Sequence, residues 1–438
     1  MGMSINSVIF ACSNCDAQFP KWTGRCTECG QWGTVHASAE GHSSKTIDKS
    51  VPEGKTILFS SLDNKTQTRI ETGITEFDRV MGSGLVPGSL VLLGGDPGIG
   101  KSTLVLQVAD KLAAKEKIIY VSGEESAEQI NLRLHRLGLN GDKINFLAEE
   151  NVEVIGKTLL KQKPALVIID SIQTMYTPDA ESEPGSITQV KAATVKFLEI
   201  AKKHNITIIL VGHVTKEGVV AGPRMLEHLV DVVLYLEGDQ YHEFRILRGV
   251  KNRFGNTNEV GIFEMQDKGL IEVKNPSEIF INTRSKNSGS CLCAVLEGKR
   301  TFLVEVQALV SKTVFGYPVR KSSGFDNNRL QMLVAVLSKR AKLPLGAQDI
   351  HVNIVGGLKI KEPAADLAVC LAIVSAFADK IIPNGSVAIG EVGLGGEVRA
   401  VSRLKERIKE AKKLGFKNII SAEQAADIKE AIKKILSP

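Results

Sequence analysis

The sequence has no long hydrophobic run. Its longest mostly apolar stretch, Ala368 to Ala378, is too short to cross a bilayer. The N-terminus also lacks a charged segment followed by a hydrophobic one, which is the pattern of a secretion signal. We therefore expect a soluble, cytoplasmic protein with no membrane partner.

Aromatic residues are scarce, at 5% of the 438 residues, but the rest of the composition is ordinary, with 43% hydrophobic and 24% charged residues. This balance excludes a disordered, collagen-like or disulfide-scaffold protein. The length predicts two to four domains, each large enough to bury its own core. The net charge of +6 is mild for this length and does not by itself identify a nucleic-acid binder.

Cysteines are few, but four of the seven lie within the first 29 residues. They form two Cys-x2-Cys pairs, and each pair places two thiolates on one turn, where both can reach a tetrahedral zinc ion. This clustering fits metal binding in a reducing compartment better than disulfides. We predict a zinc ribbon over residues 1–34, with the ligands Cys12, Cys15, Cys26 and Cys29.

Composition separates three further segments. Residues 35–68 contain few apolar side chains and are predicted to be a linker. Residues 69–274 alternate β-branched runs with helical patterns, which predicts an α/β domain with a parallel sheet covered on both faces. Residues 275–438 mix strands and helices in a second, α+β domain. The β-branched runs are residues 90–95, 117–123, 165–170, 206–212 and 230–237.

A glycine-rich segment follows the first of these runs. It matches the phosphate-loop pattern GxxxxGK[ST], directly after an apolar strand and before a predicted helix. Backbone N–H groups of such a turn hold phosphates, so we predict ATP binding. Lys101 would reach the outer phosphates and Ser102 would bind magnesium. The predicted nucleotide-binding residues are Gly95, Asp96, Pro97, Gly98, Ile99, Gly100, Lys101, Ser102 and Thr103.

Hydrolysis also requires carboxylates at the ends of neighbouring strands. Asp170 ends its strand and is predicted to bind magnesium. Glu124 is predicted to polarise the attacking water, whereas Glu125 fits a stabilising charge at a helix N-terminus equally well. His213, at the next strand end, could sense the γ-phosphate or be a structural group.

Several motifs together resemble the bacterial RadA (Sms) family of DNA repair proteins, which are paralogues of the RecA recombinases. The resemblance covers essentially the whole chain: the zinc ribbon, GGDPGIGKST, VIIDS, GHVTKEG and KNRFG follow in order. It implies a RecA-like ATPase core that acts as a ring or filament with ATP at subunit interfaces, of which we expect a hexameric ring, and the RecA recombinase as a partner. Lys251 and Arg253 of KNRFG would act on a neighbour's nucleotide or couple nucleotide state to DNA. Without the resemblance, KNRFG would be interpreted as solvated surface charge.

DNA contacts in RecA-like rings come from loops after two central strands. The loop at residues 214–224 contains Lys216 and Arg224 and suits a sugar-phosphate backbone. The loop at residues 176–185 is acidic, which weakens a symmetric two-loop arrangement on DNA.

The C-terminal segment resembles the proteolytic domain of Lon, most clearly in KEPAADLAV and GEVGLGGEVRAVSRLKER. Lon uses a Ser-Lys dyad. The alignment puts Ala364 at the nucleophile position and Lys405 at the lysine position, while Ser375 falls inside an apolar helix. We therefore predict a proteolytically inactive domain that serves as a scaffold, assembles the ring and presents a basic surface that binds DNA. The basic residues are Lys339, Arg340, Lys342, Lys359, Lys361, Arg399, Arg403, Lys405 and Arg407.

These features predict a DNA-dependent ATPase and helicase-type motor that acts on single-stranded and branched DNA. By resemblance, it would extend strand exchange and migrate branches during recombinational repair. Two alternatives stay open: an ATP-switched zinc-ribbon adaptor and, with less support, an ATP-dependent protease.

Overall fold

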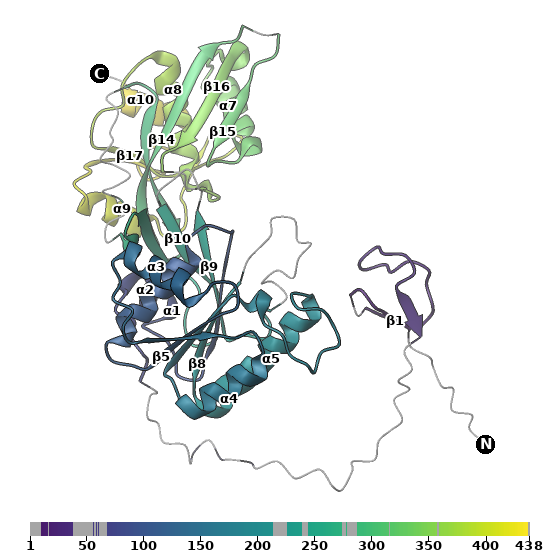
Figure 1. Ribbon diagram of the computed structural model, residues 1–438. Helices are drawn as coiled ribbons and strands as arrows, with labels where there is room; N and C mark the ends of the chain where they lie inside the picture. Colours follow the sequence, from purple (N-terminus) through teal and green to yellow (C-terminus); the bar gives the residue numbers. More distant parts are fainter. Residues whose placement is uncertain are drawn as a thin grey trace. The chain divides into compact units, whose positions relative to one another are not determined.

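The computed structural model describes residues 10–15, 17–37, 56, 58, 60, 68–212, 226–238, 244–273, 277, 287–314, 316–356 and 359–436 (Figure 1). The chain divides into two compact units, residues 1–66 and residues 67–438. Among the helices in these described ranges, none combines the length and hydrophobicity needed to span a membrane.

The smaller unit is a three-stranded antiparallel sheet. β1 (Phe10–Cys12) lies between β2 (Gln18–Phe19) and β3 (Val35–Ala37). Val35 is buried against Cys12 and Cys26. The sheet therefore extends beyond residue 34, where we predicted the ribbon to end, because β3 supplies part of its small core.

The larger unit contains a sheet of nine strands, in the order β12-β11-β10-β9-β4-β8-β7-β5-β6. The strands from β9 to β6 in that order are parallel, and β10, β11 and β12 are added antiparallel beside β9. The parallel sheet is confirmed, and the five predicted runs are β4, β5, β7, β8 and β9. The strands are β4 (Leu90–Gly95), β5 (Ile118–Ser122), β6 (Ile144–Ala148), β7 (Leu166–Asp170), β8 (Thr207–Val211), β9 (Val232–Gly238), β10 (Phe244–Asn252), β11 (Val260–Gln266) and β12 (Gly269–Glu272).

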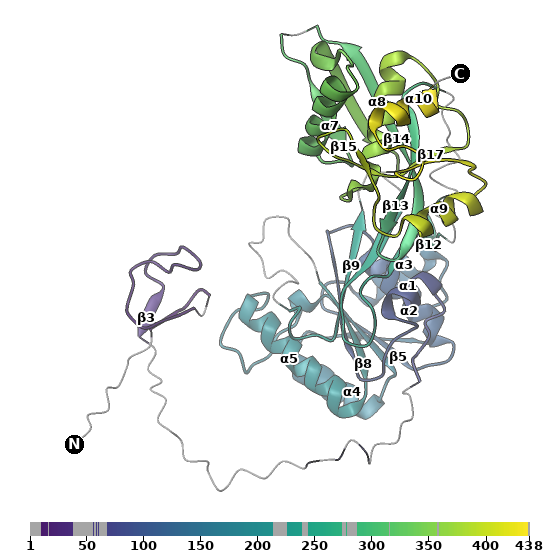
Figure 2. The ribbon, with the colours of Figure 1, turned by 180° about the vertical axis from the view of Figure 1, so that it is seen from behind.

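Helices cover both faces of this sheet (Figures 1 and 2). Side chains of β4 alternate between two cores, with Val91 and Leu93 in one and Leu90 and Leu92 in the other. This alternation explains why the strand is apolar throughout. The first core contains α1 (Thr75–Met81), α2 (Lys101–Ala113) and α3 (Ala127–Leu137), and the second contains α4 (Val152–Gln162) and α5 (Ile187–His204).

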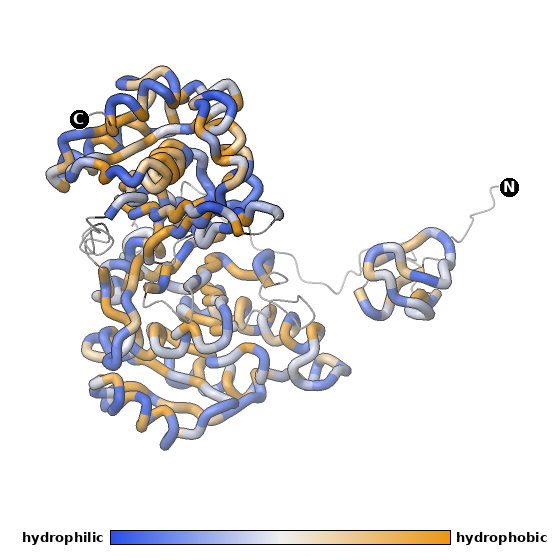
Figure 3. The backbone as a smooth tube through the Cα atoms, turned by 90° about the horizontal axis from the view of Figure 1, so that it is seen from above, coloured by the Kyte–Doolittle hydropathy of each residue, from blue (hydrophilic) through white to orange (hydrophobic). Residues whose placement is uncertain are grey.

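A second sheet has six strands in the order β15-β16-β14-β13-β17-β20. Helices α7, α8 and α10 pack on one face, and α9 packs on part of the other. Hydrophobic segments run through the middle of this lobe in Figure 3, and hydrophilic ones lie mostly around it. The strands are β13 (Ser290–Glu297), β14 (Arg300–Lys312), β15 (Arg320–Ser323), β16 (Gln348–Ile354), β17 (Ser386–Ala388) and β20 (Asn418–Ile420).

The remaining elements complete this lobe. The helices are α7 (Asn327–Arg340), α8 (Asp366–Ala378), α9 (Leu404–Lys413) and α10 (Ile428–Leu436), and β18 (Glu391–Val392) pairs with β19 (Val398–Arg399). Short 3-10 helices are η2 (Ile172–Thr174) in the first lobe, and η4 (Leu345–Ala347) and η5 (Pro363–Ala365) in the second.

The two lobes of the larger unit share a core and an ionic contact. Val260 and Ile262 of β11 belong to the same apolar cluster as the inner face of the second sheet. At the turn between β13 and β14, Glu297 pairs with Arg248 of β10 at 2.8 Å, and Arg300 pairs with the buried Glu76 of α1 at 2.5 Å. The second lobe is therefore attached directly to strands and helices of the first.

Candidate functional site

The phosphate loop connects β4 to α2 at the carboxyl end of the parallel strands. Gly98 and Gly100 have φ values of 75° and 110°, in the left-handed region that favours glycine. A Cβ atom on Gly100 would lie 2.6 Å from the Cε atom of Met265, so a side chain there would also clash. The first turn of α2 has no acidic residue. The positive end of the helix is thus available to phosphate groups, and these residues fit a bound ATP.

Lys101 points back into its own loop. Its Nζ atom donates hydrogen bonds to the carbonyl oxygens of Gly95, at 2.8 Å, and Asp96, at 3.0 Å. Burial lowers the pKa of Lys101 to about 8, although the charges of Asp170, Asp96 and Glu124 act in the opposite direction. The structure therefore brings the predicted lysine and the predicted carboxylates together.

Asp170 lies at the end of β7 with a partner that we did not predict. The hydroxyl of Tyr120, on the neighbouring strand β5, donates a hydrogen bond of 2.5 Å to Oδ2 of Asp170. Burial and the adjacent Asp170 carboxylate raise the pKa of the Tyr120 phenol well above its usual value. A tyrosine in a buried strand normally indicates packing, so no feature of the sequence singled it out.

The two candidate catalytic glutamates differ in their partners. Glu124 accepts a 2.6 Å hydrogen bond from the hydroxyl of Ser171, the residue after Asp170. Glu125 instead pairs with Arg133 of α3. Glu124 is thus linked to the end of β7, where we predict magnesium to bind, and Glu125 is linked to α3. Both line an open cleft of about 420 Å³ together with Ser122, Gly123, Ser126, Ala148, Glu149, Glu150 and Tyr176.

A buried arginine supports the phosphate loop from the antiparallel strands. Arg245 of β10 is 5% exposed, and its Nε atom donates to the carbonyl oxygen of Ile99 at 3.2 Å. The sequence carries little signal for this contact, because β10 also contains Arg248 and Lys251, and charged residues on a partly exposed strand normally face solvent.

The KNRFG segment lies near the amino-terminal ends of the parallel strands, whereas the phosphate loop lies at their carboxyl ends. Asn252 pairs with Val232 at the start of β9, whereas Gly95 pairs with Leu236 of the same strand. Four residues of a strand span about 13 Å. Lys251 and Arg253 therefore lie away from the phosphate loop of their own chain.

Both basic side chains of KNRFG contact the segment before β9. The Nζ atom of Lys251 donates to the carbonyl oxygen of Glu227 at 2.6 Å. Arg253, with 57% of its side chain exposed, lies 3.5 Å from the buried carboxylate of Asp231. Lys251 thus contacts the chain shortly after the loop that we predict to touch DNA. His213, Lys216 and Arg224 of that region lie outside the described residues.

The acidic loop at residues 176–185 is fastened to α5. The side-chain amide of Gln189 donates to the carbonyl oxygens of Thr177, Ala180 and Ser182, at 2.8 to 3.1 Å. Asp179 pairs with Lys196 at 2.6 Å. These contacts hold the loop against α5, which favours a structural role for the loop over a DNA contact.

The four N-terminal cysteines meet as predicted. Sulfur atoms of Cys12 and Cys29 are 3.7 Å apart, those of Cys15 and Cys26 are 3.6 Å apart, and all four lie within 4.8 Å of one another. Tetrahedral zinc with bonds of about 2.3 Å requires sulfurs about 3.8 Å apart, so the set fits zinc. Within this cluster, the hydrogen bond with Thr34 lowers the pKa of Cys12 to about 6, whereas burial and the neighbouring thiols raise the pKa of Cys15 to about 12.

The structure places the residues of the Lon-like motif that we singled out in different surroundings. Ala364 is buried in η5, and Lys405 is exposed on α9. Ser375 lies inside α8, as predicted, where its hydroxyl donates to the carbonyl oxygen of Lys380 at 2.5 Å and accepts from the amide of Gly289. Both hydrogen bonds of the Ser375 hydroxyl thus hold the end of α8 in place.

One basic residue of this lobe is not on the surface. Arg407 is fully buried and forms a double hydrogen bond with Glu362, at 2.7 and 2.5 Å. It also donates to the carbonyl oxygens of Ala294 and Ser402. Our expectation that Arg407 adds to a basic surface is therefore wrong. Arg407 is buried, and its charge is neutralised by the carboxylate of Glu362, which lies 45 positions earlier in the chain. The other eight basic residues are exposed.

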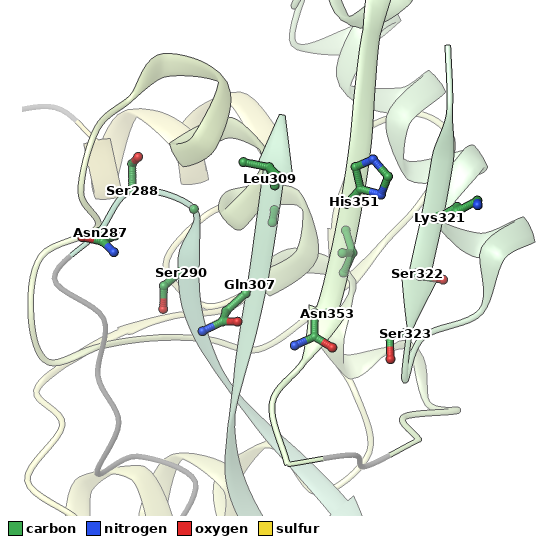
Figure 4. Close-up of a pocket in the computed structure, with 13 residues that line it drawn as sticks. Asn287, Ser288, Ser290, Gln307, Leu309, Lys321, Ser322, Ser323, His351 and Asn353 are labelled. Atoms are coloured by element: carbon green, nitrogen blue, oxygen red, sulfur yellow. The ribbon is translucent and has the colours of Figure 1, made fainter. Parts of the chain in front are cut away.

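A polar groove of about 640 Å³ lies on the part of the second sheet that α9 leaves uncovered (Figure 4). Its floor is a row of side chains from four adjacent strands, paired in register: Ser290, Gln307, Asn353 and Ser323. Such a row can donate and accept hydrogen bonds across the sheet. In the sequence, the alternation of polar and apolar residues along β16 indicates a sheet with one polar face.

The mostly parallel sheet, the phosphate loop after β4 and the carboxylates at the next strand ends define an ATPase core of the P-loop class. The comparisons agree with this class. Residues 61–219 match the AAA domain, residues 10–37 match the rubredoxin metal binding domain, and residues 336–437 match the Lon protease (S16) C-terminal proteolytic domain.

Full-length relatives identify the family. The DNA repair protein RadA of Bacillus subtilis is 49% identical over 424 residues, which cover 94% of this chain and 91% of the relative. RadA of Listeria monocytogenes is 48% identical over 414 residues, with the same coverage of 94% and 91%. The chain belongs to the RadA family of DNA repair proteins, so the resemblance noted in the sequence is confirmed.

Two solved structures resemble part of the chain. A KaiC-like protein from Pyrococcus horikoshii has a TM-score of 0.40 at 22% identity, and the RadB recombinase has a TM-score of 0.38 at 25% identity. Each alignment covers 47% of this chain and 99% of the solved chain.

Proposed function

We propose that the protein is an ATP-driven DNA motor that processes branched intermediates of recombinational repair. It would migrate branches and extend strand exchange on single-stranded and branched DNA, with the RecA recombinase as partner. The observation that carries the proposal is the meeting of Lys101, Asp170 and Glu124 at one edge of the sheet in a chain of the RadA family.

Each group at this edge has a role in the proposed hydrolysis. Lys101 exchanges its contacts with loop carbonyls for the outer phosphates of ATP. Ser102 and Asp170 would hold magnesium, which, when bound, supplies positive charge that stabilises the transferred phosphoryl group. Glu124, held by Ser171, orients the attacking water.

Assembly into a ring would complete the site. Lys251 and Arg253 lie at the opposite edge from their own phosphate loop, so a neighbouring copy is the site on which they can act. A homohexamer would place them at each subunit interface. The contact between Lys251 and the carbonyl oxygen of Glu227 would pass the nucleotide state to the loop containing Lys216 and Arg224.

The second lobe would contribute DNA affinity rather than peptide hydrolysis. Residues 287–438 contain 23 Lys and Arg against 14 Asp and Glu, whereas the whole chain has a net charge of only +6. An excess of positive charge in one part of a chain favours binding to the phosphate backbone. The buried Ala364 at the nucleophile position argues against a protease.

A fork-unwinding assay tests the proposal. Wild-type protein, with ATP and magnesium, should separate a fluorescently labelled three-strand branched DNA, and Lys101→Ala should not. Protein that hydrolyses ATP but leaves every branched substrate intact would contradict the motor and favour the ATP-switched adaptor.

A further inference from the structure

The Asp170 carboxylate is held by a neighbour that belongs to no phosphate-loop motif. Its Oδ2 atom accepts the 2.5 Å hydrogen bond from Tyr120, and the phenol is fully buried. Asp170 itself is only 7% exposed. A carboxylate oxygen in such surroundings needs a donor, because leaving it unsatisfied costs free energy.

The sheet fixes this donor in place. β5 and β7 are adjacent parallel strands, and Ser122 lies opposite Asp170 in their register. Tyr120 is two residues earlier on β5, on the same face, among the apolar side chains that pack beneath α2. Its ring is therefore held by the core, and its hydroxyl reaches the strand end where Asp170 lies.

We propose that Tyr120 is a positioning residue for the magnesium-binding carboxylate. Its hydroxyl holds Oδ2 of Asp170, which would leave the other carboxylate oxygen for a magnesium ion. This inference rests on the proposed ATP hydrolysis, and it adds a residue to which neither the family motifs nor the sequence analysis assigned a role.

A second hydroxyl at the same strand end acts on a different group. Ser171 donates to Glu124, the proposed water-orienting residue, at 2.6 Å. Asp170 and Ser171 are adjacent in the chain but have different proposed roles. Asp170 is proposed to bind magnesium, and Ser171 contacts the glutamate that is proposed to orient water. Tyr120 should influence magnesium binding, and Ser171 should influence the rate of hydrolysis.

The test measures the magnesium dependence of nucleotide binding, which requires no hydrolysis. A fluorescent, non-hydrolysable ATP analogue is titrated with magnesium in the full-length protein. Tyr120→Phe keeps the ring and removes only the hydroxyl, so the magnesium concentration for half-saturation should rise about tenfold, as expected for one hydrogen bond to a charged group. At saturating magnesium, the affinity for the analogue should be unchanged.

Tyr235→Phe is the matched control. It removes a tyrosine hydroxyl from strand β9 that lies 3.3 Å from the carboxylate of Glu227 rather than against Asp170. This variant should keep the wild-type magnesium midpoint. Ser171→Ala should also keep it while lowering kcat.

Two outcomes would overturn the proposal. One is an unchanged magnesium midpoint in Tyr120→Phe. The other is an equal loss of nucleotide affinity at all magnesium concentrations together with a lower melting temperature, which would make the hydroxyl merely structural. Absence of DNA unwinding by the wild-type protein would contradict the proposed motor but would leave this binding test intact.

Discussion

Charged residues are arranged differently in the two lobes of the larger unit. At the carboxyl edge of the first sheet, Lys101, Asp170 and Glu124 lie close together beside an open cleft. In the Lon-like lobe, Glu362, which is close to the position aligned with the Lon nucleophile, pairs with the buried Arg407.

This difference separates a chemical site from a structural one. A chemical site keeps groups available to a ligand, and among the described residues the ammonium group of Lys101 is bonded to two loop carbonyls that it can release. A buried ion pair has satisfied its own groups and offers them to nothing else. The comparison fits our proposal that the first lobe performs the reaction and that the second supplies scaffold and surface charge.

The largest expected effect is at the phosphate loop. Lys101→Ala removes the ammonium group that would neutralise the outer phosphates, so ATP turnover should fall by more than about a hundredfold. Lys339→Ala, an exposed lysine of α7 in the other lobe, is the control and should retain turnover without DNA. Comparable losses in both variants would erase the distinction between the lobes.

The next effect concerns the stability of the Lon-like lobe. Arg407→Met leaves the Glu362 carboxylate without its buried partner and should lower the free energy of unfolding by about 3 to 5 kcal/mol. Replacing both residues by methionine should restore part of this loss. Arg403→Met, which breaks an exposed pair with Glu406, should cost about 1 kcal/mol or less in the same urea titration. Equal losses for Arg407 and Arg403 would show that burial of the pair is unimportant.

Mixing two inactive variants tests whether the ATPase site is shared between subunits. Arg253→Ala should reduce turnover by at least about tenfold while preserving nucleotide binding, because Arg253 acts on the neighbouring copy. Mixed with Lys101→Ala, it should regain activity at interfaces that combine an intact phosphate loop with an intact Arg253. No recovery on mixing would place Arg253 outside the shared site.

A smaller effect should appear in the pH dependence of ATP binding. Burial lowers the pKa of Lys101 from 10.5 to about 8. The protonated form binds phosphate, so affinity should be flat below pH 8 and should fall by up to about tenfold per pH unit above it. Lys101→Arg, which stays charged, should show no such fall. A fall in both proteins would assign the titration to another group.

The last prediction is that Ala364→Ser has no effect on proteolysis. Ala364→Ser restores a hydroxyl at the former nucleophile position, but that residue is buried and Lys405 is exposed on α9. We expect no cleavage of an unfolded protein substrate such as casein, with or without ATP. Cleavage that depends on the new serine would show that the protease site is intact apart from its nucleophile.

Local patterns predicted the parts that depend on short segments. The apolar runs predicted the central strands, and the spacing of Cys12, Cys15, Cys26 and Cys29 predicted the metal site. Both signals lie within a few neighbouring residues, so no knowledge of the tertiary fold was needed.

Contacts between distant segments could not be predicted in this way. Arg407 occupies a helix rich in charged residues, and its partner Glu362 lies 45 positions earlier in the chain. Tyr120 and Asp170 are 50 positions apart and meet only because β5 and β7 are neighbours in the sheet. The roles of the site residues and the domain boundaries stay predictions.

The central claim is that DNA drives the ATPase, and one measurement tests it most directly. ATP turnover is measured with and without single-stranded DNA at two salt concentrations, with Lys101→Ala as the blank. We predict stimulation by DNA that shrinks at the higher salt concentration, because phosphate contacts are screened. Turnover that is indifferent to DNA at both salt concentrations would contradict the motor.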